Sequence, residues 1–204
     1  MNDQRFYYYP VWVRIWHWIN VILFLILLST GISMQYANPQ QPLLISFEVA
    51  VKYHNIAGVT ISINYLLFVL GNLFTTNGNF YRTNPRGLLN RVLRQAYFYT
   101  VGMFRKDPPP FPLTHREKFN PLQKISYIIT MYVGYPIIII SGWTLLFPET
   151  IPHKLFGVSG LLLTDLIHVI MGFFLSMFMF IHIYVCTIGD TLYSNIKSMI
   201  TGWH

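Results

Sequence analysis

Long apolar stretches alternate with shorter polar ones along the chain, and this pattern predicts four membrane-spanning helices. A span needs about 20 largely apolar residues to cross about 30 Å of hydrocarbon. Four windows meet that requirement: Val11–Gln35, Val49–Phe74, Ile125–Phe147 and Leu161–Ile188. The first is longer than the apolar core of a signal peptide, and no small-residue cleavage pattern follows it. We therefore expect an all-α integral membrane protein, a four-helix bundle that forms a single domain over residues 1–204.

The segment between the second and third spans carries a different periodicity. From Pro85 to Phe104, apolar residues recur at helical spacing and arginines interleave with them. That pattern predicts an amphipathic helix in the membrane interface. Asn84 and Pro85 suit its N-cap and first helical position.

Composition and charge support a membrane protein and set its orientation. Hydrophobic residues make up 53% of the chain and charged residues only 10%, whereas soluble proteins average about 25% charged. Nine of the 14 lysines and arginines lie between Arg82 and Lys124, and only Lys52 and Lys154 fall on the other side. The positive-inside rule then places both termini and the basic loop in the cytoplasm. Contact with lipid headgroups explains the basic loop without nucleic acid.

Four of the seven histidines lie inside the predicted spans, at two depths. His17 and His182 fall near the inner ends of the first and fourth spans, and His54 and His168 near the outer ends of the second and fourth. Fourteen residues separate His168 from His182, which is about 21 Å along a helix and returns to within about 40° of one face. One helix can therefore contribute to two sites stacked across the bilayer. The remaining histidines are expected at the surface: His115, His153 and His204.

Paired histidines of this kind suit the ligation of haem iron. Neutral imidazole binds iron well, and coordination occupies a lone pair that would otherwise be costly in hydrocarbon. Gly58 and Gly172 each follow an outer histidine by four residues, where a porphyrin would need space. The single cysteine, Cys186, excludes a cysteine-ligated iron–sulfur cluster, and the chain has no CxxCH motif for covalent haem.

The four histidines of the spans also suit two different roles. Each could make an ordinary hydrogen bond between helices. Alternatively, the four could form a proton or metal pathway, although such a pathway usually includes intramembrane carboxylates and only Asp165 is available.

Several motifs resemble those of the bacterial four-helix cytochrome b subunits that serve formate dehydrogenase, nickel–iron hydrogenase and thiosulfate reductase. They are RIWHW at the first span, His54 with Gly58, IHVIMGFFLSMFMFIHIY on the fourth span, and the tail IKSMITGWH. The resemblance implies two haems b, an inner one held by His17 and His182 and an outer one held by His54 and His168. It also implies an electron-transfer subunit of the bacterial inner membrane. Such a subunit links an outer-face partner, an iron–sulfur or multihaem protein, to menaquinone or ubiquinone.

The same resemblance suggests quinone contacts at the start of the third span. Asn120 and Gln123 match an Asn-x-x-Gln-Lys segment near which the formate dehydrogenase relatives bind quinone. The alternative is that Asn120 is only the N-cap of this helix, with Pro121 at its first position. Two rival functions also remain: a membrane anchor with structural haems, and a histidine-based proton pathway.

Overall fold

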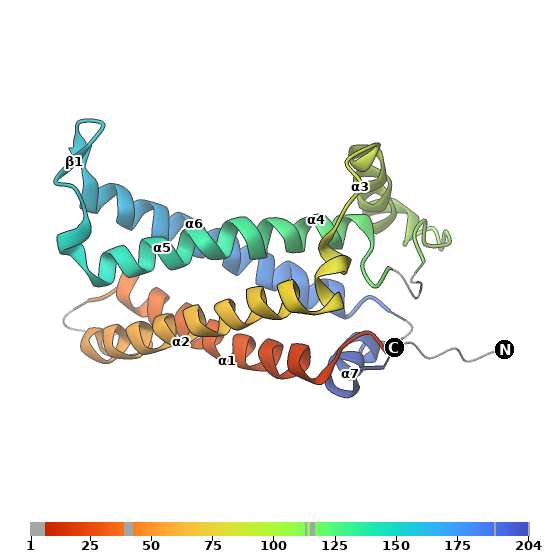
Figure 1. The fold of residues 1–204 in the computed structure, drawn as a ribbon, viewed down its shortest axis with the longest axis horizontal. Helices are drawn as coiled ribbons and strands as arrows, with labels where there is room; N and C mark the ends of the chain where they lie inside the picture. Colours follow the sequence, from red (N-terminus) through yellow and green to blue (C-terminus); the bar gives the residue numbers. More distant parts are fainter. Residues whose placement is uncertain (1–6, 39–42, 113, 115–116, 190, 204) are drawn as a thin grey trace. The chain divides into compact units, whose positions relative to one another are not determined.

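The computed structural model describes residues 7–38, 43–112, 114, 117–189 and 191–203. In this part of the chain, four helices are long and apolar enough to span a membrane (Figure 1). They are α1 (Val11–Gln35), α2 (Phe47–Phe74), the helical stretch Pro121–Leu146, and α6 (Gly160–Cys186). The prediction of an all-α membrane protein with four spans is confirmed, with boundaries within a few residues of those expected.

The third span is not a uniform helix. It consists of α4 (Pro121–Ile129), a π-helical turn η3 (Thr130–Gly134), and α5 (Tyr135–Leu146). Pro136 lies in the first turn of α5 and has no N–H to bond to the preceding turn. A wider π-helical turn just before it is one way in which a helix accommodates such a break.

The predicted amphipathic helix is present as α3 (Leu88–Tyr97), followed by a π-helical turn η2 (Phe98–Gly102). Its predicted start was wrong. Gly87 is the N-cap, with a left-handed φ of 66°, whereas the Asn84 side chain accepts a bond from the Arg86 N–H in a preceding turn. Glycine adopts this left-handed conformation easily, which explains why Gly87 rather than Asn84 comes directly before the helix.

The loop between α5 and α6 contains a small hairpin that the sequence did not predict. A 3-10 turn η4 (Pro148–Thr150) leads to β1 (Lys154–Leu155), which pairs antiparallel with β2 (Val158–Ser159). The two turn residues, Phe156 and Gly157, both have positive φ values, 52° and 83°. Such angles match the twist of a two-residue hairpin turn.

The chain divides into two compact units. One comprises Met1–Phe68 and Gly134–His204 and contains α1, α5, α6, most of α2, and α7 (Ser194–Thr201). The other, Val69–Val133, contains the end of α2, a 3-10 turn η1 (Thr76–Tyr81), α3 and α4.

Aromatic and polar contacts link the helices of the first unit. On α1, Trp16 stacks on Phe68 of α2 with ring centroids 4.5 Å apart. The Trp16 indole N–H donates to the backbone carbonyl of Asn64 on α2. Asn20, one turn further along α1, exchanges hydrogen bonds with the Tyr135 hydroxyl of α5. Hydrogen bonds of this kind stabilise helix association in lipid because polar groups there have few other partners.

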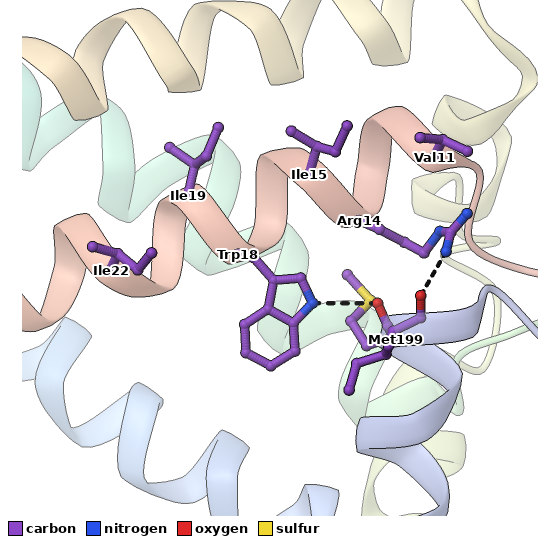
Figure 2. Close-up of a pocket in the computed structure, with 8 residues that line it drawn as sticks. Val11, Arg14, Ile15, Trp18, Ile19, Ile22 and Met199 are labelled. Atoms are coloured by element: carbon purple, nitrogen blue, oxygen red, sulfur yellow. Dashed lines mark hydrogen bonds between the residues drawn. The ribbon is translucent and has the colours of Figure 1, made fainter.

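Helix α7 is tied to the N-terminal end of α1 (Figure 2). The Arg14 guanidinium donates to the carbonyl of Ile200, and the Trp18 indole N–H donates to that of Met199. Both carbonyls lie in the last turn of α7, where helix carbonyls lack partners within the helix and a cation is favourable. A largely apolar groove of about 410 Å³ runs between the two helices at this point.

Candidate functional site

The four histidines of the spans form two facing pairs. His17 of α1 faces His182 of α6, with ring centroids 6.3 Å apart. His54 of α2 faces His168 of α6, with ring centroids 6.1 Å apart. All four rings are half-buried within the first unit. The structure thus brings together the same histidines that the sequence pattern pairs.

The spacing within each pair suits one metal ion between the rings. A metal–imidazole bond measures about 2 Å, and each ring nitrogen lies roughly one bond length from its ring centre, so two axial imidazoles have centroids about 6 Å apart. Among the described residues, no group of three or more His, Cys, Asp or Glu could hold a metal ion by itself. Haem supplies the four remaining nitrogens that a two-histidine site lacks.

Two hydroxyl groups hold the rings of the His54–His168 pair. Thr30 Oγ1 lies 2.8 Å from Nδ1 of His54, and Ser141 Oγ lies 3.0 Å from Nδ1 of His168. Both hydroxyls already donate to carbonyls four residues earlier in their own helices, those of Ile26 and Ile137. Each oxygen is therefore best placed to accept from an imidazole Nδ1–H.

That arrangement selects the tautomer a metal requires. With the proton on Nδ1, the Nε2 lone pair of each ring is available as a ligand, which is the usual arrangement at metal-binding histidines. The sequence analysis missed Thr30 and Ser141 as functional residues. The only available signal was a hydroxyl within an apolar run, and which histidine each one meets depends on how the helices pack.

The His17–His182 pair has different surroundings. Nδ1 of His17 is buried without a hydrogen-bond partner among the described residues. Nε2 of His182 lies 3.6 Å from the Cys186 thiol, and the His182 ring stacks on Phe178 with centroids 5.9 Å apart. A thiol and an aromatic ring therefore lie beside His182.

Glycines border the His54–His168 pair on two sides. A Cβ added at Gly31 or Gly142 would lie 3.6 Å from Cε1 of His54 or 3.1 Å from Cε1 of His168, so both glycines allow close approach of the rings. A Cβ at Gly58 would meet nothing within 4 Å, and one at Gly172 would meet only Ile138 Cδ1 at 4.0 Å. Facing imidazoles of the right tautomer, with open space one turn along each helix, fit a bis-histidine haem.

Comparison with known proteins identifies the family. Residues 8–202 match the family described as "Prokaryotic cytochrome b561". The chain belongs to this family. The cytochrome is similar to "Putative cytochrome YdhU" of Escherichia coli (strain K12), at 35% identity over 203 residues, covering 100% of this chain and 76% of that protein. It also resembles "Putative protein-methionine-sulfoxide reductase subunit YedZ1" of Azospira oryzae, at 23% identity over 157 residues, covering 71% of this chain and 72% of that protein.

Family membership and the four apolar helices establish the general character of the protein. It is a multi-pass bacterial membrane cytochrome that binds haem b and transfers electrons. The resemblance to bacterial cytochrome b subunits noted from the sequence motifs is confirmed.

Asn120 and Gln123 of the cytochrome lie in the second unit and form a capping box at the start of α4. The Asn120 side chain accepts from the Gln123 backbone N–H at 2.9 Å, and the Gln123 side chain accepts from the Asn120 backbone N–H at 3.2 Å. The side-chain amide of Asn120 also donates to the Tyr99 hydroxyl at 2.8 Å. The N-cap prediction for Asn120 is confirmed. The Nε2 donor of Gln123 takes no part in the capping box.

Lys118, two residues before this cap, is a buried cation of the second unit that the sequence analysis did not single out. It is 4% exposed, and its ammonium donates to the Asn77 side-chain oxygen at 2.7 Å. The ammonium also lies 4.4 Å from the centroid of the Phe80 ring and 5.1 Å from that of Phe119. Burial lowers the pKa of Lys118 to about 7, since it disfavours the charged form.

The lowered pKa of Lys118 predicts a pH-dependent stability. Between about pH 7 and pH 10.5 the folded state releases this proton while the unfolded state retains it, so raising the pH favours folding. We expect the melting temperature of the wild type to rise by several degrees between pH 7 and pH 9 relative to Lys118→Met. Lys197→Met, at an exposed site on α7, is the control and should follow the wild type. If the melting temperatures of the wild type and Lys118→Met change by the same amount between pH 7 and pH 9, the prediction is wrong.

Proposed function

We propose that this cytochrome binds two haems b and transfers electrons between a redox subunit on the outer face of the membrane and the quinone pool. The observation that carries the proposal is the presence of two facing histidine pairs, with centroids 6.3 Å and 6.1 Å apart. His17 and His182 would be the axial ligands of the inner haem, and His54 and His168 those of the outer haem. When bound, haem b supplies a centre that gains and loses one electron at a time.

The chain would lie in the bacterial inner membrane as a single domain with both termini in the cytoplasm. Support comes from the basic residues, nine of which lie between Arg82 and Lys124, because cytoplasmic loops carry an excess of Lys and Arg. The histidines near the outer ends of α2 and α6 would then lie closest to a partner outside the cell membrane.

The partner would be an iron–sulfur or multihaem subunit that carries out the substrate chemistry. One relative is named as a reductase subunit, which supports membership of a larger oxidoreductase complex. The single cysteine of this chain cannot supply the four thiolates of an ordinary iron–sulfur cluster. Electrons exchanged at the outer face would therefore come from, or go to, a separate subunit.

Quinone would bind near the start of α4 on the cytoplasmic side. The Nε2 group of Gln123 is a donor that could bond a quinone carbonyl, with Asn120 holding the backbone of this turn in place. Reduction of one quinone consumes two electrons and two protons, and the protons would be taken up from the cytoplasm.

The haem content of the purified protein tests the proposal directly. A pyridine haemochrome assay with a reduced-minus-oxidised visible spectrum should give about two haems b per chain. A quinol analogue should then reduce both haems. Two haems that a quinol analogue cannot reduce would favour a membrane anchor with structural haems. Colourless protein, made with ample haem available, would favour a histidine-based proton pathway.

A Gln123→Glu variant separates the two roles of Gln123. Glutamate keeps a side-chain oxygen that can accept from the Asn120 N–H, so we expect α4 and the haem content to be preserved. It removes the Nε2 donor, and loss of one hydrogen bond to quinone should slow haem reduction by a quinol analogue about tenfold. Stopped-flow absorbance at the haem α-band measures this rate. Reduction at the wild-type rate would show that Gln123 acts only as a cap.

A further inference from the structure

The contacts at Nδ1 differ between the His54–His168 pair and His17. At the His54–His168 pair, each Nδ1 lies within 3.0 Å of a hydroxyl oxygen, that of Thr30 or of Ser141. Both hydroxyls lie in closely packed positions, Thr30 being 3% exposed and Ser141 5% exposed. Nδ1 of His17, by contrast, has no partner among the described residues.

We propose that Thr30 and Ser141 are positioning residues of the outer haem, which hold its two axial imidazoles and lower its midpoint potential below that of the inner haem. This inference rests on the proposed di-haem function. The hydroxyls of Thr30 and Ser141 would act on the haem through His54 and His168. The resulting difference in midpoint potential would give electron transfer a preferred direction.

The physical reason lies in the donor strength of the imidazole. An Nδ1–H that donates a hydrogen bond shifts electron density toward Nε2 and makes the ring a stronger ligand. A stronger ligand stabilises ferric iron more than ferrous iron, so the midpoint potential falls. Thr30 acts on one side of the outer site and Ser141 on the other, and their effects should add.

Two charged residues one turn before a ligand act in the same direction, whereas Lys52, two residues before His54, lies on a different face of α2. Asp165 precedes His168 by three residues on α6, and Arg14 precedes His17 by three residues on α1. Residues three apart on a helix lie on the same face. Because ferric haem carries one more positive charge than ferrous haem, the carboxylate favours the oxidised outer haem and the guanidinium favours the reduced inner haem.

The consequence is a downhill path from the outer haem to the inner haem. Electrons that enter at the outer face would move toward the higher potential at the inner face, where quinone is proposed to bind. The chain would therefore favour quinone reduction over quinol oxidation.

The test is a redox titration of purified protein in which both haems are resolved. The single-haem variant His54→Ala assigns the inner potential. In Thr30→Val and Ser141→Ala, which remove the hydroxyls, we expect the ratio of reduced to oxidised outer haem at a fixed potential to rise about threefold to tenfold. That corresponds to an upward shift of about 30–60 mV, since a tenfold ratio is 59 mV for one electron. The inner potential should not change.

Matched variants separate this effect from general packing. Ser33→Ala and Thr144→Val remove hydroxyls from the same two helices. Among the described residues, the hydroxyl of Ser33 donates to the Ser29 carbonyl and that of Thr144 to the carbonyls of Ile140 and Ser141. Both controls should leave the two potentials unchanged. Thr30→Ser restores a hydroxyl and should restore the wild-type potential.

Electron paramagnetic resonance provides a second readout of ring position. The planes of His54 and His168 are 68° apart, and the anisotropy of a low-spin ferric signal depends on that angle. Loss of a hydroxyl that holds one ring should alter one of the two ferric signals.

The outcomes are distinct. Fewer than two haems in the wild type would overturn the proposed function itself. Two haems whose potentials and ferric signals are unaffected by Thr30→Val and Ser141→Ala would overturn only this inference, as would equal loss of the outer haem from Thr30→Val and Thr30→Ser. Loss of the outer haem from Thr30→Val, with retention of that haem in Thr30→Ser, would support this inference.

Discussion

Replacing His168 or His182 by alanine is expected to lower the haem content from about two to about one per chain. Both residues lie on α6, but each faces a different partner, His54 or His17. Removing one axial ligand leaves that haem held by a single histidine. We expect a haem held in this way to be lost during purification. The two variants should therefore retain different haems, with different midpoint potentials, and the double variant should retain none.

A histidine outside the pairs provides the control for this experiment. His153 lies in the loop between α5 and α6, and His153→Ala should keep about two haems. Haem is quantified by the pyridine haemochrome assay against protein concentration. Full haem content in either His168→Ala or His182→Ala would show that the pairs are not axial ligand sets.

Replacing Gly58 by leucine is expected to remove the outer haem while the bundle still folds. Gly58 follows His54 by one helical turn, and a Cβ added there would meet nothing within 4 Å. The protein alone therefore has room for a larger side chain at this position. A porphyrin bound between His54 and His168 would occupy that space, so leucine should compete with it and lower the haem content to about one per chain.

The remaining haem serves as an internal measure of folding in Gly58→Leu. We expect the inner haem to keep its wild-type spectrum and potential, because His17 and His182 are not altered. Thr60→Leu adds similar bulk at an exposed position of the same helix and should retain both haems. Two haems of unchanged potential in Gly58→Leu would show that the space beside His54 is not used by the cofactor.

Much of the fold could be predicted from the sequence because membrane insertion depends on local composition. Each span is apolar over a length that matches the hydrocarbon core, and the structure has helices at all four predicted places. The N-cap at Asn120 could also be predicted, since it needs only a side chain and the N–H groups of its own first turn. The start of α3 was missed because Asn84-Pro85 and Gly87 both suit a helix start, and local preference did not decide between them.

The pairing of the histidines was also accessible from the sequence, for a related reason. The 14-residue spacing from His168 to His182 places both rings near one face of a single helix. Helix direction then predicts that His17 matches His182 in depth and that His54 matches His168. The facing pairs in the structure have this arrangement.

Only the tertiary structure decided which groups surround those rings. Thr30 and His54 are 24 residues apart, and Ser141 and His168 are 27 apart, on different helices in each case. Their contact depends on how each helix is rotated about its axis and how closely it packs on its neighbour, which no local pattern specifies. The burial of Lys118 against Asn77, 41 residues away, was decided in the same way. The sequence by itself therefore determined the spans and which histidines pair, because these follow from transfer free energy and helix periodicity, whereas the hydrogen-bond partners required the packed helices.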